Sequence, residues 1–315
     1  METVDPLQPR PGRAATERQT AAKPWTEHII EALIRLAGVS VIIIILLIFF
    51  FLIREALPAY GQISLKDLFN RSWYPIENYF GILSLLVGSL LVTFGAIIIA
   101  VPLGLVTAVY LGEIAPEWQR EILKPLIEVL AGIPSIVLGF FGWVALAPVI
   151  QRLGAPSGLT AFTGALILAF MSLPTIISIT EDSLYAVPKE YRDGALAIGA
   201  THWQTIWRVV VPAARSGIII AIMLGIGRAI GETMAVMLVT GNAANIPALN
   251  AGVFFQPVRT MTATIAAEMG EVAQGSLHYN ILFVIGITLF IITFIINFLA
   301  SRLVRGGKRR RSSQL

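Results

Sequence analysis

The sequence contains no cysteine, only three histidines and few charges. Without cysteine the chain can form no disulfide, iron–sulfur cluster or thiolate metal site. His28, His202 and His278 lie far apart in sequence, and we interpret them as ordinary polar residues rather than metal ligands. Charged residues make up 13% of the chain, whereas a typical soluble domain carries about 25%. This shortage of charge argues against a soluble protein.

Long apolar runs take the place of the missing charges, and 56% of the 315 residues are hydrophobic. Eighteen residues without a charge separate Arg35 from Arg54, and 35 separate Glu77 from Glu113. Such runs can cross a hydrocarbon core of about 30 Å as helices. The sequence therefore predicts an all-α integral membrane protein with six transmembrane helices, at 29–55, 79–112, 122–150, 159–181, 214–241 and 279–303.

The distribution of lysine and arginine predicts the orientation of these helices. With the N-terminus inside, 17 of the 23 basic residues fall in inside segments and 5 in outside segments, while Arg228 lies within the membrane. Basic residues are enriched on the cytoplasmic side of membrane proteins. We therefore expect both termini to be cytoplasmic. The pI near 9.5 reflects these tails and loops and does not indicate nucleic-acid binding.

The predicted helices divide the chain into a tail, a membrane domain and a second tail. Residues 1–28 read as a disordered cytoplasmic tail, 29–303 as the transmembrane domain with its core at 79–303, and 304–315 as a basic cytoplasmic tail. An inside loop is expected at 182–213, and outside loops at 56–78 and 242–278. In the first outside loop, Trp73 and Tyr74 are suited to a membrane-interface belt.

Two prolines fall inside predicted helices, Pro102 in the second and Pro134 in the third. Proline removes a helical hydrogen bond and favours a kink. A packing role is the simpler interpretation, and a hinge beside a transport pathway is the alternative.

The inside loop carries apolar residues at helical spacing. Pro188 is expected to start a segment and Pro212 to stop it. Between them recur Leu196, Gly199, Trp203, Ile206, Trp207 and Val210 at steps of three and four. This stripe predicts a short helix that lies on the membrane surface or docks into another protein.

The same loop resembles that of the permeases of ATP-binding-cassette (ABC) importers. Their pattern is Glu-Ala-Ala, three residues, Gly, nine residues, Ile, one residue, Leu-Pro. The corresponding residues here are Asp193, Gly194, Ala195, Gly199, Val209, Val211 and Pro212. The spacing matches throughout, while Asp193, Gly194 and the two valines depart from the pattern. The resemblance implies that this loop couples the permease to an ATPase subunit.

Three further stretches, GIGRAIGETMAV, VLAGIPSIVLGFFGW and MTATIAAEMGE, resemble the phosphate-importer permeases of the PstC type. The resemblance covers about 29–303 and implies the ABC type-1 importer permease architecture in a bacterial inner membrane. It also implies three kinds of partner: a second, PstA-like permease, a dimer of a PstB-like ATPase, and an extracytoplasmic phosphate-binding protein.

The sequence lacks the G-x-x-x-x-G-K-[ST] loop that holds the phosphates of ATP. We therefore expect this chain to be a transport subunit and not an enzyme, with no cofactor of its own. ATP and magnesium are expected on the partner ATPase.

Arg228 and Glu232 are the only charges between Arg215 and Arg259. In one continuous helix at 214–241 they are four residues apart on one face and can form an ion pair. A structural pair is one interpretation. The other is a substrate pathway in which Glu232 holds Arg228 until an oxyanion competes for the guanidinium. Ionisable residues inside a membrane favour the functional interpretation.

Glu268 and Glu271 fall in the second outside loop. Solvated acids are the simpler interpretation, and a docking surface for the binding protein is the alternative. Two other functions also stay open. One is a permease of the same architecture for another solute, such as molybdate, sulfate or an amino acid. The other is a stand-alone secondary transporter or channel, although we see none of the inverted repeats typical of many such proteins.

Overall fold

The protein is described by a computed structural model that covers residues 25–312, apart from 249 and 251. Within this range the chain is mostly helical, as predicted. Six helices are long and apolar enough to cross a membrane: Glu27–Tyr60, Ile82–Ile114, Ser135–Arg152, Ala161–Tyr185, His202–Gly231 and Leu277–Leu299. Most of the predicted N-terminal tail, residues 1–24, lies outside the described residues.

The elements follow one another along the chain as a series of helices with one small hairpin. They are α1 (Trp25–Tyr60), α2 (Leu65–Leu68), β1 (Trp73–Tyr74), the 3-10 helix η1 (Pro75–Glu77), β2 (Tyr79–Phe80), α3 (Ile82–Val109), the π-helix η2 (Tyr110–Ile114), α4 (Glu117–Ala131), α5 (Ser135–Phe141), the π-helix η3 (Gly142–Leu146), α6 (Ala147–Arg152), α7 (Ala161–Tyr185), α8 (Lys189–Ala197), α9 (His202–Thr205), the π-helix η4 (Ile206–Val210), α10 (Val211–Gly231), α11 (Met234–Val239), the 3-10 helix η5 (Val253–Phe255), α12 (Met261–Glu268) and α13 (Leu277–Ser312).

The chain divides into two units, Met1–Phe50 and Phe51–Leu315. The described part of the first unit belongs to α1 and is apolar on all sides between Val41 and Phe50. A helix that is apolar all round is typical of a membrane span.

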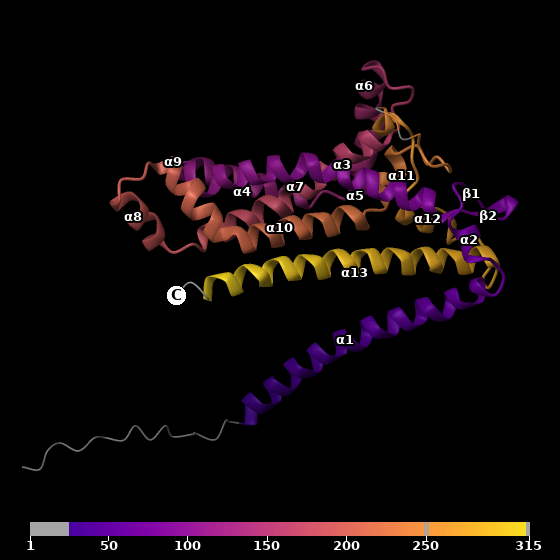
Figure 1. Ribbon diagram of the computed structural model, residues 1–315, viewed down its shortest axis with the longest axis horizontal. Helices are drawn as coiled ribbons and strands as arrows, with labels where there is room; N and C mark the ends of the chain where they lie inside the picture. Colours follow the sequence, from indigo (N-terminus) through magenta and orange to yellow (C-terminus); the bar gives the residue numbers. More distant parts are fainter. Residues whose placement is uncertain (1–24, 249, 251, 313–315) are drawn as a thin grey trace, which may run out of the picture. The chain divides into compact units, whose positions relative to one another are not determined.

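A bundle of helices forms the second unit, with α3, α7 and α10 packed side by side at its centre (Figure 1). Close approach depends on small residues. A Cβ atom added to Gly104 of α3 or to Gly225 of α10 would lie 2.7 Å from side-chain atoms of Ile176 on α7. Glycines at such positions let membrane helices come into backbone-level contact.

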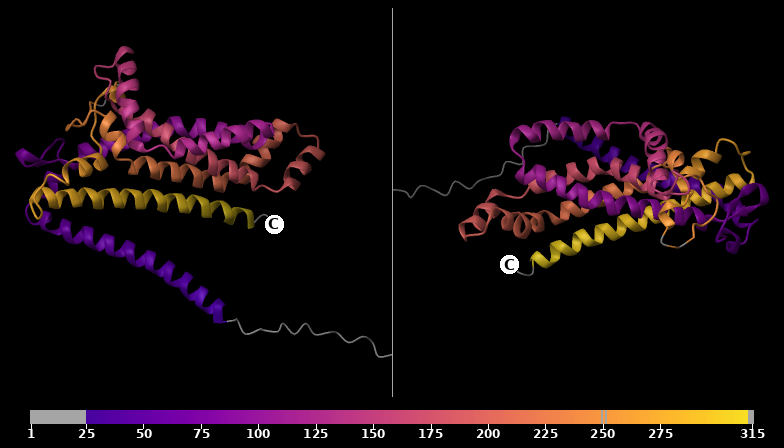
Figure 2. Two further views of the ribbon diagram at one scale, coloured as in Figure 1. Left: turned by 180° about the vertical axis from the view of Figure 1, so that it is seen from behind. Right: turned by 90° about the horizontal axis from the view of Figure 1, so that it is seen from above.

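The two ends of this bundle carry different elements (Figure 1, Figure 2). The helices α8 and α9 cap one end, which we call the loop end. At the opposite end lie the hairpin β1–β2, in which Trp73 pairs with Phe80, and the short helices α2 and α12. There the buried Trp73 and Phe80 pack in one cluster with Ile281, Leu282 and Ile285 of α13.

Two of the predicted helices are broken in the structure. The third, expected at 122–150, is interrupted after Ala131 at Gly132-Ile133-Pro134, because Pro134 lacks an N–H and disfavours helical backbone at the residue before it. Pro102, in contrast, lies inside an uninterrupted α3. The fifth, expected at 214–241, ends at Gly231 and resumes at Met234.

Candidate functional site

The backbone leaves the helical conformation between α10 and α11, at Glu232 and Thr233. Glu232 has extended dihedrals, with φ −68° and ψ 134°. Its backbone carbonyl accepts a hydrogen bond from Thr262 Oγ1 at 2.7 Å, and its side-chain Oε1 accepts one from the N–H of Ala235 at 3.1 Å. These two contacts stabilise the break between the two helices within an otherwise apolar run. Non-helical backbone at membrane depth occurs where it is buried in protein or lines a cavity.

Arg228 lies in the last turn of α10 and is half-buried. Its Nη1 donates to Thr175 Oγ1 of α7 at 3.3 Å. The positive charge stands beside the carbonyl end of its own helix, where a cation is favoured. Gly227 and Gly231 have open space where a Cβ would stand, so this turn is not crowded by the rest of the described chain.

The predicted ion pair between Arg228 and Glu232 is not formed. No salt bridge joins them within the described residues, and each side chain has a different hydrogen-bond partner. The prediction assumed a continuous helix, in which residues four apart share a face. The break after Gly231 removes that geometry, and Arg228 lies at a helix end instead of a helix midpoint. Their assignment to a substrate pathway stays a prediction.

A small cavity of about 10 Å³ adjoins the break. Four hydroxyl residues and one acid supply the polar part of its lining: Ser89, Thr93, Thr260, Thr262 and Glu232. A space of this size holds about one water molecule and does not admit an oxyanion in this conformation. The sequence did not single out these hydroxyls, because serine and threonine in apolar helices commonly bond their own backbone and give no specific signal.

The loop at 182–213 contains two short helices that meet at a sharp turn. The first helix, α8, ends at Ala197, and the second, α9, begins at His202 after a capping box formed by Thr201 and Gln204. Gly199 lies between them with a φ of +84°, a left-handed conformation that favours glycine. The glycine of the family pattern therefore forms the turn between the two short helices.

Pro212 does not end the segment, contrary to the prediction. The helical path runs from His202 through η4 and α10 to Gly231. Pro212 occupies the first turn of α10, directly after the π-helix Ile206–Val210. A helix tolerates proline in its first turn, and a π-helix before it changes the hydrogen-bond register where the proline N–H is missing.

The apolar stripe of the loop splits between two environments. Ile206 and Val210 are buried against the bundle, whereas Leu196 and Trp203 are exposed, as is Ile198 nearby. Among the residues of the family pattern, Asp193, Gly194, Gly199 and Pro212 are exposed, and Ala195 is buried. The loop end therefore presents apolar side chains together with most of the pattern residues.

The two glycines of this loop predict opposite effects of an alanine substitution. Gly199→Ala places a Cβ on left-handed backbone and is expected to destabilise the turn by about 1–2 kcal/mol. Gly194→Ala lies within α8 with open space around it and is expected to stabilise that helix by about 0.5–1 kcal/mol. Limited proteolysis of the loop compares them: Gly199→Ala should be cleaved faster than the parent chain and Gly194→Ala more slowly. The same direction for both variants would contradict the turn geometry.

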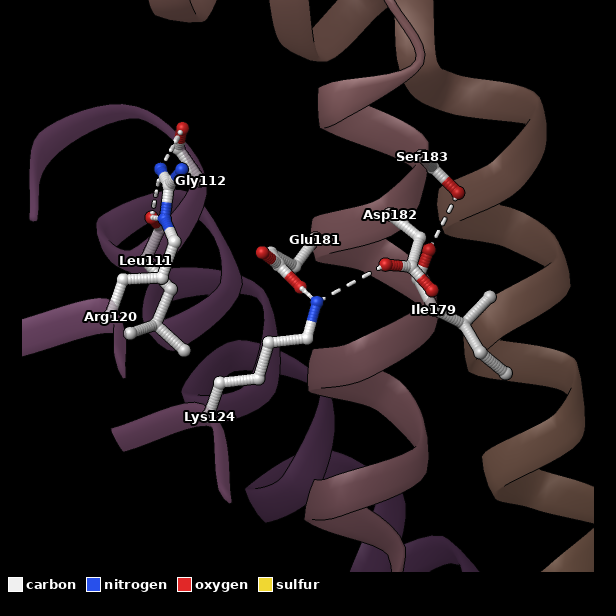
Figure 3. A network of polar contacts seen from close by, with 8 residues as sticks. All are labelled: Leu111, Gly112, Arg120, Lys124, Ile179, Glu181, Asp182 and Ser183. Carbon is white, nitrogen blue, oxygen red and sulfur yellow. Dashed lines mark hydrogen bonds and ion pairs between the residues drawn. The ribbon is translucent and has the colours of Figure 1, made fainter. Parts of the chain in front are cut away.

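Ion pairs join the helices near the loop end (Figure 3). Lys124 of α4 contacts Glu181 of α7 at 2.6 Å and the exposed Asp182 at 3.5 Å. The hydrogen bond to Glu181 raises the pKa of the Lys124 amine above its ordinary value, so the amine stays charged at neutral pH. Arg120 of α4 donates to the backbone carbonyls of Leu111 and Gly112 in η2, the π-helix that follows α3.

A second group of polar contacts surrounds Glu268 at the opposite end. Its carboxylate contacts Arg259 Nη2 at 2.6 Å, His278 Nε2 at 2.7 Å and Trp73 Nε1 at 3.1 Å. Glu268 is therefore not the solvated acid of the simpler interpretation, while Glu271 is exposed. Trp73 is 1% exposed, so it is not an interface-belt residue. Nowhere in the described chain do three His, Asp or Glu side chains form a metal-binding group.

A bundle of membrane-length helices, with a broken helix beside a polar cavity and a two-helix loop at one end, defines a multi-pass membrane transport subunit. The chain belongs to the family described as the binding-protein-dependent transport system inner membrane component, whose model matches residues 100–309. It is thus an inner-membrane protein, as predicted.

Curated relatives cover most of the chain. The phosphate transport system permease protein PstC of Mesorhizobium japonicum is 38% identical over 91% of this chain and 91% of its own length. PstC of Pasteurella multocida is 34% identical over 88% of this chain and 92% of its own. A probable ABC transporter permease protein of Bacillus subtilis, YqgH, is 38% identical over 77% of this chain and 79% of its own. The predicted resemblance to PstC-type permeases is confirmed.

Solved structures share the fold at low sequence identity. A bacterial alginate ABC transporter crystallised with its periplasmic protein matches with a TM-score of 0.61 at 14% identity, over 90% of this chain and 97% of the other. The inward-facing methionine ABC transporter MetNI matches with 0.55 at 18% identity, over 78% and 99%. These matches confirm the predicted permease architecture, and the cytoplasmic placement of the termini stays a prediction.

Proposed function

We propose that this chain is the membrane-spanning subunit of an ATP-driven importer of inorganic phosphate. The observation that carries the proposal is the 38% identity to a phosphate transport permease across 91% of both chains. A match over so much of each chain spans the segments that form the helix break, the cavity lining and the loop, and is not limited to one shared motif.

ATP hydrolysis is assigned to a separate ATPase dimer, PstB-like in type, because this sequence lacks a phosphate-binding loop. ATP and its magnesium belong to that partner. The exposed Leu196, Ile198 and Trp203 at the loop end supply an apolar surface for the ATPase. Apolar and aromatic side chains of this kind are enriched at the centres of protein interfaces.

The basic residues orient the molecule in this proposal. Lys189, Arg192 and Arg208 lie in the loop at 182–213, which places the loop end on the cytoplasmic side. Both termini are then cytoplasmic, and the end with Trp73 and Glu268 faces the extracytoplasmic binding protein.

A second permease, PstA-like in type, completes the pathway. The open space beside Gly227 and Gly231 adjoins the turn that carries Arg228, and the exposed outer face of α3 carries Leu90, Phe94 and Ile98. Apolar faces of this kind are buried against lipid or against another membrane helix. Small residues such as Gly227 and Gly231 favour packing against another membrane helix, because they allow close approach.

Arg228 is the residue that meets the anion in this proposal, with Glu232 holding the backbone open beside it. A guanidinium offers a planar fork of donors that matches the oxygens of an oxyanion. The structure changes the earlier hypothesis in one respect, because Glu232 is bonded to Ala235 and does not hold Arg228. The arginine therefore needs no release from a carboxylate before the anion arrives.

Reconstitution tests the proposal. The chain is coexpressed with its PstA-like permease, its PstB-like ATPase and its phosphate-binding protein. The complex is purified through a tag on this chain and placed in liposomes that contain ATP. We expect copurification of the ATPase and ATP-dependent uptake of phosphate, but not of sulfate or molybdate. Uptake of sulfate or molybdate in place of phosphate would assign the same architecture to another solute. Uptake without ATP or an ATPase partner would assign a secondary transporter.

A further inference from the structure

Arg192 of α8 contacts three residues that lie at or near the ends of two central helices. Its Nη2 and Nε donate to the two carboxylate oxygens of Glu113 at 2.6 and 3.2 Å, and Glu113 belongs to η2 at the end of the α3 helix. Its Nη1 and Nη2 also donate to the carbonyls of Val187 and Leu184, which follow or end α7, at 2.6 and 2.9 Å. One side chain thus joins α8 to the ends of two central helices.

These contacts are sheltered from solvent. The side chain of Glu113 is 5% exposed and that of Arg192 22% exposed. A two-point contact between a guanidinium and a carboxylate fixes orientation as well as distance, unlike a contact to a lysine amine. The carbonyls of Leu184 and Val187 lie at and just after the end of α7, so the guanidinium adds a second donor to the Leu184 carbonyl, which also accepts from the N–H of Val187, and ties Val187 to α8.

We propose that Arg192 is a positioning residue that makes α8 move as one body with α3 and α7, so that movement of an ATPase docked on the loop reaches the core of the permease. This inference rests on the proposed function, because it assigns the loop to the ATPase interface. Arg192 itself contacts neither the anion nor ATP in this proposal. Arg192 directly precedes Asp193, the first residue of the family pattern. The same short helix therefore carries both exposed residues of the family pattern and the side chain that contacts Glu113.

The neighbouring ion pair provides a comparison inside the same molecule. Lys124 and Glu181 join α4 to α7 through a 2.6 Å contact in which Glu181 is equally buried, but neither residue belongs to α8 (Figure 3). Loss of that pair loosens the bundle without separating the loop from α3. The two pairs therefore separate a general loss of stability from a loss of coupling.

The test compares two charge-neutral double variants in the assembled complex, Glu113→Gln/Arg192→Met and Lys124→Met/Glu181→Gln. Removing both charges avoids leaving one buried and unpaired. The absence of cysteine allows spin labels to be placed on cysteines introduced at the exposed Val106 of α3 and at the exposed Glu190 of α8, which is not one of the apolar residues assigned to the ATPase surface. Two quantities are measured: the distribution of distances between the labels, and the number of phosphate ions taken up per ATP hydrolysed.

We expect Glu113→Gln/Arg192→Met to broaden the distance distribution and to lower phosphate uptake per ATP about tenfold, while the ATPase still copurifies. Arg192→Lys keeps the charge but loses the planar fork of the guanidinium. Its distance distribution and its phosphate uptake per ATP should lie between those of the double variant and the parent. The control Lys124→Met/Glu181→Gln should keep the parent's distance distribution and ratio.

Three outcomes would overturn the inference. If the parent complex forms and imports phosphate, but the Glu113→Gln/Arg192→Met variant keeps the narrow distribution and the parent's ratio, then Arg192 is not a coupling residue and the proposed function stands. If the ATPase does not bind the parent chain, both proposals fail together. An equal loss in both double variants would also contradict a specific role for Arg192.

Discussion

Phosphate uptake is expected to fall about 10- to 100-fold when Arg228 is replaced by glutamine. Hydrogen bonds to charged groups contribute about 1.5–3 kcal/mol each, and each 1.4 kcal/mol corresponds to a factor of ten. Glutamine keeps a polar side chain of similar reach but loses the charge and the guanidinium fork. The measurement is ATP-dependent phosphate uptake by the reconstituted complex. Binding of the ATPase and its basal hydrolysis should be unchanged, because Arg228 lies in the last turn of α10, at the end of that helix away from the loop.

Two further variants test whether the loss of uptake is due to the charge at position 228. Arg228→Lys keeps the charge and should retain more uptake than Arg228→Gln, because an anion still meets a cation in the pathway. Arg152→Gln removes an exposed arginine at the end of α6 and should leave uptake at the parent level. Normal uptake in Arg228→Gln would exclude a pathway role, whereas loss of the assembled complex would make the residue structural.

The helices of the protein could be predicted from hydropathy because the membrane imposes their length and composition. The break at Glu232 could not, because the sequence GETM contains no proline and one glycine that also fits a helix. What stabilises the break is the contact of Thr262 with the Glu232 carbonyl, between residues 30 positions apart. Contacts at that sequence distance leave no local pattern. The assumption of an unbroken helix then led to an ion pair that does not form.

The loop shows the same division between local and long-range causes. The turn at Gly199 could be predicted, because a left-handed residue between two short helices requires glycine. The link between Arg192 and Glu113 joins residues 79 positions apart, so the sequence offered only two isolated charges near predicted helix ends. The prediction that Pro212 ends the segment was wrong for a different reason. Proline is compatible with the start of a helix as well as with the residues after its end.

The unfolding temperature is expected to fall by about 6–20 °C when Glu268 is replaced by glutamine. Breaking a buried ion pair costs about 3–5 kcal/mol, and each kcal/mol lowers the unfolding temperature of a domain of this size by about 2–4 °C. Glu268 and Arg259 are 16% and 17% exposed, so solvent replaces little of the lost interaction. The measurement is thermal unfolding of the purified chain in one detergent.

Glu271→Gln is the matched control, because Glu271 lies three residues away, is exposed and belongs to the same stretch EMGE. Its effect should stay within about 0.5 kcal/mol, as for most surface substitutions. A third variant, Arg259→Met/Glu268→Met, removes both charges and should be more stable than Glu268→Met alone, since neither charge is then left buried without a partner. Equal unfolding temperatures for Glu268→Gln and Glu271→Gln would mean that the carboxylate is not what holds Arg259, His278 and Trp73 together. Arg259 directly precedes Thr260, which lines the cavity, so the ion pair adjoins the cavity wall in sequence.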